Sequence, residues 1–93
     1  MRDHPVVPIS WASQNAIPNR YLVCLKEHAD LESHIGWLEQ QISKADNELI
    51  KCRVVYKYGL TKGYTAVLTE PILTTLTKRE DVKSITEDSQ PTW

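Results

Sequence analysis

Two cysteines, three histidines and a pair of adjacent acids are the residues whose chemistry could give this chain a catalytic or metal site. Cys24 and Cys52 lie far apart, and His4, His28 and His34 have no spacing with either cysteine that is typical of metal ligands. We therefore expect two free thiols, histidines at the surface, and neither a metal ion nor a cofactor.

The two acids, Glu87 and Asp88, are neighbours near the end of the chain. On a continuing strand their carboxylates would point to opposite faces, so they could not share a proton as a catalytic pair does. Neither cysteine has a histidine that the sequence places beside it as a general base. These patterns favour a binding protein over an enzyme.

The residues after this acidic pair form a short peptide, Ser89 to Trp93, that ends in an aromatic side chain. It follows directly on a strand-like segment that begins at Val82. A last strand that runs into an uncovered, aromatic-ended peptide gives another protein a segment to hold. We expect this tail to be part of a binding site.

The composition is that of one small globular domain with a single core: 93 residues, 41% hydrophobic and 25% charged. A formal net charge of −1 gives no bulk attraction to nucleic acid or to anionic lipid. No apolar run has the length of a membrane span, and the N-terminus lacks the apolar region of a secretory signal. We expect a soluble chain, monomeric when free, without nucleic-acid or membrane partners.

Residues 1–19 contain three of the five prolines and show no sustained hydrophobic period. They predict an extended leader that is partly ordered at best, although it has apolar side chains that could dock on the domain: Val6, Val7, Ile9 and Trp11.

Two secondary-structure elements are predicted next. Tyr21 to Lys26 is a β-branched and aromatic run of strand length. Asp30 stands where a helix N-cap belongs, and apolar residues follow it at helical spacing, which predicts a helix from Leu31 to Lys44. Its buried stripe consists of Leu31, Ile35, Leu38 and Ile42.

The second half of the chain predicts three strands and one helix. Alternation from Ile50 to Tyr58 indicates a strand that would bury Ile50, Cys52, Val54, Tyr56 and Tyr58. A glycine-flanked connection leads to a strand from Tyr64 to Thr69, so the two should form a hairpin. Thr69 or Glu70 can cap a short helix with Pro71 in its first turn, and the last strand runs from Val82 to Thr86. The buried side of that helix consists of Ile72, Leu73 and Leu76.

The resulting order, βαββαβ, predicts an α+β, ferredoxin-like fold: a four-stranded antiparallel sheet with both helices on one face. Cys24 and Cys52 would then lie on opposite faces of non-adjacent strands, which argues against a disulfide. The other face of the sheet stays open, as a docking surface or as a solvated face. The alternation assigns to this open face Leu22, Cys24, Lys51, Arg53, Val55, Lys57, Thr65 and Val67.

RNA-recognition domains share this element order, and Lys62 to Val67 begins like their third-strand signature. That signature needs aromatic residues at its third, fifth and eighth positions, where this chain has Tyr64, Ala66 and Thr69. The alternation also places Tyr64 on the helix-covered face, where it could stack on no base. The pattern does not support RNA binding.

Three segments, taken together, resemble the subtilisin-propeptide-like inhibitor family: Asn19 to Lys26, Lys62 to Leu68, and Val82 to Asp88. That family includes the propeptides of subtilases and stand-alone fungal and plant inhibitors of the same proteases. The resemblance extends from Arg20 to Trp93. It implies a ferredoxin-like inhibitor domain over residues 20–88 whose partner is a subtilisin-like serine protease.

The resemblance also implies roles for particular residues. The open sheet face would pack on two surface helices of the protease, with Leu22, Cys24, Arg53, Val55, Thr65 and Val67 as the docking residues. Glu87 and Asp88 match the acidic pair that caps the N-termini of those protease helices. The tail would lie in the substrate cleft as an added strand: Ser89, Gln90, Pro91, Thr92 and Trp93.

Counted from Glu87, the tail is about one residue shorter than in the family. Trp93 then either stops one position before the primary specificity pocket or fills it, and in the second case Pro91 falls where the cleft takes a backbone N–H that proline lacks. Two versions of the function follow: a free-standing intracellular inhibitor, or an excised propeptide that also acts as a folding chaperone of a secreted or vacuolar subtilase. A ferredoxin-like interaction domain without a protease partner is the alternative of another class.

Overall fold

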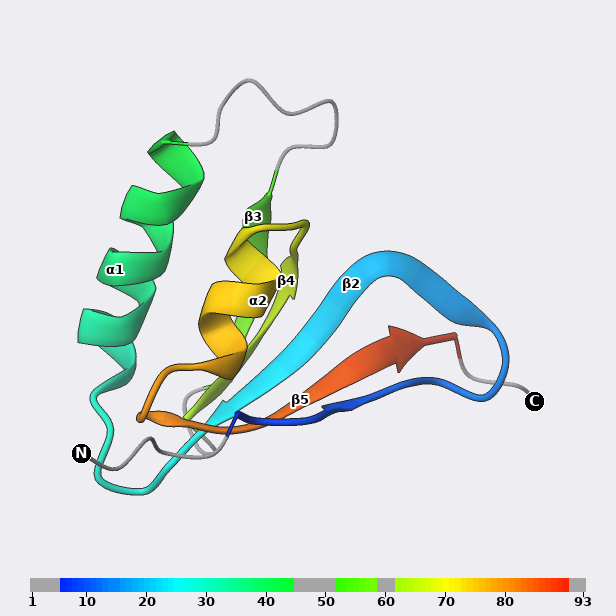
Figure 1. The fold of residues 1–93 in the computed structure, drawn as a ribbon, viewed down its shortest axis with the longest axis horizontal. Helices are drawn as coiled ribbons and strands as arrows, with labels where there is room; N and C mark the ends of the chain where they lie inside the picture. Colours follow the sequence, from blue (N-terminus) through cyan, green and yellow to red (C-terminus); the bar gives the residue numbers. More distant parts are fainter. Residues whose placement is uncertain (1–5, 45–51, 59–61, 91–93) are drawn as a thin grey trace.

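A computed structural model of the chain describes residues 6–44, 52–58 and 62–90. These residues form an α+β domain of two helices and five strands (Figure 1). In chain order the elements are β1 (Ile9–Ser10), β2 (Ala16–Leu25), α1 (Leu31–Lys44), β3 (Arg53–Tyr58), β4 (Gly63–Val67), α2 (Ile72–Thr77) and β5 (Val82–Ser89).

The strands form one mixed sheet in the order β1-β5-β2-β4-β3. The pairs β2 with β5, β2 with β4 and β3 with β4 are antiparallel, as the sequence predicts, and β4 separates β2 from β3. The prediction of a four-stranded antiparallel sheet is nevertheless wrong by one strand. β1 adds to the outer edge of β5 in the parallel direction, with Ile9 opposite Ile85.

The added strand comes from the segment that the sequence predicts as a leader. The backbone N–H of Val7 donates to the carbonyl of Thr77 at 2.7 Å, and the side chains of Val7 and Ile9 pack against the core. β2 also begins at Ala16, inside the predicted leader. Pro18 is tolerated there because the ladder between β2 and β5 is irregular from Ala16 to Tyr21, so no regular hydrogen bond is lost.

Helix α1 has the predicted bounds, and its N-terminus is capped as predicted. The Asp30 carboxylate accepts hydrogen bonds from the backbone N–H and the hydroxyl of Ser33, at 3.3 and 2.6 Å. The pKa of Asp30 is lowered, chiefly by that hydroxyl. Gly36 lies on the exposed side of the helix, where a Cβ atom would meet nothing within 4 Å.

Helix α2 begins after Pro71, whose missing N–H costs nothing at a helix start. The Glu70 carboxylate accepts hydrogen bonds from the backbone N–H of Thr74, at 3.1 Å, and from its hydroxyl. The N-cap position itself is occupied by Pro71, so the prediction of Thr69 or Glu70 as the cap is wrong, although the Glu70 side chain bonds the first turn of the helix. The predicted buried side is confirmed, since Ile72, Leu73 and Leu76 are at most 5% exposed.

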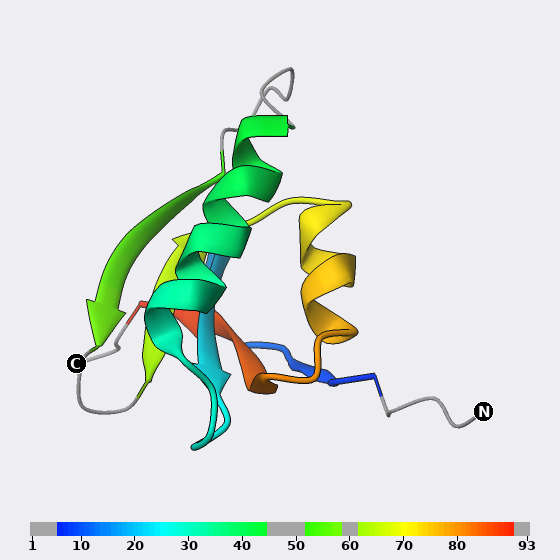
Figure 2. The same cartoon turned by 90° about the vertical axis from the view of Figure 1, so that its left-hand side faces the viewer.

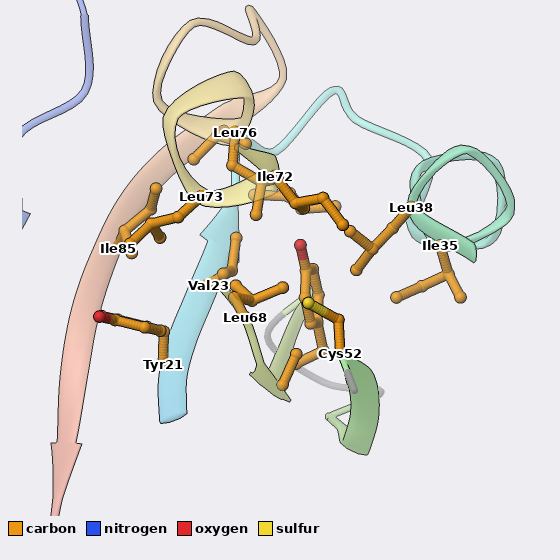
Figure 3. Packing of buried hydrophobic residues seen from close by; sticks show 14 of the residues in the cluster. Tyr21, Val23, Ile35, Leu38, Cys52, Leu68, Ile72, Leu73, Leu76 and Ile85 are labelled. Atoms are coloured by element: carbon orange, nitrogen blue, oxygen red, sulfur yellow. The ribbon is translucent and has the colours of Figure 1, made fainter. Parts of the chain in front are cut away.

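Both helices pack on the same side of the sheet, as Figures 2 and 3 show from two directions. In Figure 3, Leu73 and Leu76 of α2 and Leu38 of α1 point toward Val23 and Ile85 of the strands. Val23, Leu38, Leu76 and Ile85 have no measurable exposure, so the core lies between the helices and the sheet. Cys52 is buried and points into this core (Figure 3), whereas Cys24 is only half-buried, and both are free thiols, as predicted.

Candidate functional site

The face of the sheet opposite the helices is built from rows of residues that the strand register places side by side. One row joins Tyr56 of β3, Thr65 of β4, Leu22 of β2 and Thr86 of β5. The next row joins Tyr58, Gly63, Cys24 and Ser84, and a third contains Arg53, Val67 and Arg20. These rows define the open face.

A β-bulge in β3 changes which side chains reach this face. Val54 is paired with Ala66, but Tyr56, two residues further on, is paired with Thr65, so Val55 has no partner and the alternation shifts by one. Tyr56 and Tyr58 therefore lie on the open face, and the prediction that they face the core is wrong.

Lys57 moves to the helix side through the same bulge, and its assignment to the open face is also wrong. Its ammonium nitrogen lies 3.9 Å from the Glu32 carboxylate of α1. Both side chains are well exposed, so this ion pair reports the direction of Lys57 and adds little stability.

Most of the predicted docking residues lie on the open face. Leu22, Cys24 and Val67 are half-buried and Arg53 is exposed. Thr65 is only 3% exposed, and its Oγ1 atom lies 2.9 Å from the hydroxyl of Tyr58. Val55 is half-buried within the bulge. Ile50 and Lys51 lie outside the described residues.

The acidic pair sits at the end of β5, with its two carboxylates on opposite sides of the sheet. Glu87 is paired with the buried Tyr21, and its Oε1 atom accepts a hydrogen bond from the backbone N–H of Ala12 at 2.9 Å. Asp88 lies 3.1 Å from the guanidinium of Arg20. Both acids thus have partners within the chain, and Asp88 lies on the side of the open face.

The described part of the tail continues the last strand, because β5 ends at Ser89 and not at Thr86 as predicted. Ser89 is paired with Ala16 and is exposed, and the backbone N–H of Gln90 donates to the carbonyl of Asn15 at 2.9 Å. The N-terminal segment therefore contacts both Glu87 and the first residues of the tail. Pro91, Thr92 and Trp93, and with them the two tail registers, lie outside the described residues.

A histidine predicted to lie at the surface is instead buried and hydrogen-bonded. His34 of α1 is 1% exposed, and its Nδ1 and Nε2 atoms lie 2.9 Å from the Asp81 carboxylate and 2.8 Å from the Tyr64 hydroxyl. Asp81 in turn accepts two hydrogen bonds of 3.0 Å from Arg79. The prediction of surface histidines is wrong for His34, whose place between Leu31 and Leu38 on the apolar stripe was the available signal.

The protonation of this network follows from its surroundings. Burial lowers the pKa of His34 below its ordinary 6.5, against the pull of the Asp81 carboxylate. Burial opposes ionisation of Asp81, but hydrogen bonds from Arg79 and His34 lower its pKa to about 2. At neutral pH a neutral His34 donates from Nδ1 to Asp81 and accepts at Nε2 from Tyr64, which satisfies all three groups.

The histidine, aspartate and tyrosine resemble an acid–base relay, but their place in the fold makes them structural. Tyr64 has no exposed surface, and burial raises the pKa of its hydroxyl far above the ordinary value. A substrate could reach neither it nor His34. Within the described residues, no three His, Cys, Asp or Glu side chains are placed to hold a metal ion, and no helix is long and apolar enough to cross a membrane.

Comparison with known proteins defines the class of this domain. The profile of the family described as Peptidase inhibitor I9 matches residues 20–91, and the chain belongs to that family. Its members are subtilase-propeptide-like inhibitor domains that act on subtilisin-like proteases and are not catalytic domains. No curated protein matches the chain.

Proposed function

We propose that this chain inhibits a subtilisin-like serine protease by docking its open sheet face on the enzyme and placing residues 89–93 in the substrate cleft. The observation that carries the proposal is the match to the Peptidase inhibitor I9 family over residues 20–91, which covers the open face and the start of the tail. The exposed Ser89 and Gln90 follow Asp88 at the end of β5, so one partner can contact the open face and the tail together.

The tail would add a strand to the walls of the cleft, with main-chain hydrogen bonds giving affinity and alternate side chains giving specificity. Asp88 would face the N-terminus of a protease helix, where unpaired N–H groups attract a carboxylate. Glu87, whose carboxylate lies on the other side of the sheet, would keep its bond to Ala12 and hold the N-terminal segment against β5. Because only the folded domain presents all these groups at once, its stability contributes to its inhibition constant.

The experiment compares inhibition of a subtilisin panel by the intact chain and by a version that lacks Ser89 to Trp93. The proposal expects nanomolar to micromolar inhibition that weakens at least about tenfold without the tail, since the tail supplies several main-chain hydrogen bonds. A chain with the same five residues in scrambled order is the matched control, and circular dichroism verifies that all three fold. No inhibition of any subtilase would favour an interaction domain without a protease partner.

The Peptidase inhibitor I9 family also includes subtilase propeptides, so the chain could assist the folding of a protease as well. A refolding assay separates these roles. If the chain is a chaperone, adding it to a denatured mature subtilase should raise the protease activity that is recovered once the chain itself has been digested. A chain that serves only as an inhibitor would leave the recovery unchanged.

A further inference from the structure

Two tyrosines of the edge strand β3 form an aromatic pair on the open face, where the sequence pattern does not predict them. The rings of Tyr56 and Tyr58 lie edge to face, with their centres 4.8 Å apart. The Tyr58 hydroxyl is fixed by its 2.9 Å contact with Thr65. The pair is therefore held in place before any partner binds.

The pair is also exposed, at 59% for Tyr56 and 37% for Tyr58. Among the described residues, the other exposed large hydrophobic side chains are Val6 and Trp11, which belong to the N-terminal segment at the opposite edge of the sheet. Elsewhere the open face presents small, half-buried or charged groups, such as Thr86, Leu22 and Arg53. Its exposed apolar surface is thus concentrated on the two tyrosines.

We propose that Tyr56 and Tyr58 are binding residues of the open face that pack against apolar side chains on the surface of the protease. This inference rests on the proposed inhibitor function. Exposed aromatic side chains supply much of the binding energy of interfaces, because they bury a large area with few rotatable bonds. A pair already fixed by its own contacts loses little freedom on binding, which further favours the complex.

The bulge provides a control set of three adjacent positions in one strand. Tyr56→Thr and Tyr58→Thr remove a ring from the open face, whereas Lys57→Thr changes a side chain on the helix side. Threonine has a high β-propensity, so the edge strand is preserved in each variant. Tyr58→Phe removes only the hydroxyl that contacts Thr65. Circular dichroism and urea midpoints check that each variant is folded.

The measurement is the inhibition constant against a subtilisin that the unmodified chain inhibits. Each tyrosine-to-threonine change is expected to raise this constant at least about tenfold, as for interface hot spots, while Lys57→Thr stays within about twofold. The inhibition constant of Tyr58→Phe should lie between those of Tyr58→Thr and Lys57→Thr. Hydroxyl-radical footprinting of the unmodified complex should show both tyrosines protected, and this measurement decides the matter if a variant fails to fold.

Two results would overturn the inference, and they can be told apart. If the unmodified chain inhibits but both threonine variants inhibit equally well, or the tyrosines are unprotected in the complex, the inhibitor function stands and the role of the pair is refuted. If the unmodified chain inhibits no subtilase, the proposed function itself fails and the role of the pair fails with it.

Discussion

The Nδ1 atom of His34 lies 2.9 Å from the Oδ2 atom of Asp81, and this contact ties helix α1 to the loop between α2 and β5. Arg79 extends the link, since its guanidinium lies 4.1 Å from the centre of the Trp37 ring of the same helix. In a small domain such a buried polar bridge fixes how one helix sits on the sheet.

Replacement of His34 should therefore be costly. In His34→Ala the Asp81 carboxylate and the Tyr64 hydroxyl each lose a partner, and a cavity is left in the core. We expect the free energy of unfolding to fall by about 2 to 4 kcal/mol in urea titrations. His28→Ala, at an exposed position, should change it by less than about 0.5 kcal/mol. Equal effects of the two substitutions would contradict the role of His34.

The lowered pKa of His34 also determines how the stability of the domain depends on pH. Burial holds the pKa of His34 below 6.5 in the folded state. As the pH falls below 6.5, His34 therefore binds a proton more readily in the unfolded chain than in the folded chain. The free energy of unfolding should be highest above about pH 6.5 and should fall as the pH decreases below it. A second loss should follow below about pH 4, where the unfolded chain protonates Asp81, whose folded pKa is about 2. A His34→Gln variant should lose the first of these two slopes.

Gly36→Ala should stabilise the domain. Gly36 lies in the middle of α1 on its exposed side, so alanine gains helix propensity without a clash. We expect the free energy of unfolding to rise by about 0.5 to 1 kcal/mol. Introducing a glycine at another exposed position of the helix, Ser43→Gly, should lower the free energy of unfolding. A loss of stability in Gly36→Ala would mean that this side of the helix is covered.

The N-terminal strand should contribute to stability through Ile9, which is half-buried against the core. Ile9→Ala removes part of that contact and should cost about 1 to 2 kcal/mol, less than a fully buried isoleucine. The neighbouring Val6 is 58% exposed, so Val6→Ala is the control and should have almost no effect. Thermal unfolding of the two variants under the same conditions tests the difference.

The two acids should differ in their effects on inhibition and on stability. Asp88→Asn should weaken inhibition roughly two- to fivefold, an effect that shrinks at high ionic strength, because the carboxylate would face a helix N-terminus. Glu87→Gln instead weakens the bond to the Ala12 N–H and should speed amide exchange there. Inhibition assays at two salt concentrations, with hydrogen exchange of the N-terminal segment, separate the two roles.

The sequence predicts best those elements whose signals are local. Helix α1 has the predicted bounds because its cap at Asp30 and its apolar stripe lie within one segment. The placement of Tyr64 against the core follows in the same way from alternation within β4. The inner strand order could be predicted because βαββαβ elements have few ways to pack.

The errors arise where a distant partner decides the structure. Val54, Val55 and Tyr56 are three apolar residues in a row, so the alternation of β3 is ambiguous at this point and only the pairing with β4 reveals the bulge. Ile9 and Ser10 become a strand only because the edge of β5 accepts them. His34 is polar yet buried, because Asp81 and Tyr64 come from other parts of the chain to satisfy it.

The pairing of β1 with β5 also bears on the order of folding. Ile9 faces Ile85 across 76 positions of sequence (85 − 9), so closing this pair costs more chain entropy than closing the β3–β4 hairpin. Such non-local contacts slow folding and form late in the transition from the unfolded chain. The outer strand should therefore be the last to join the sheet and among the first to open in the native state, so that a protease in excess would meet the N-terminal segment before the core.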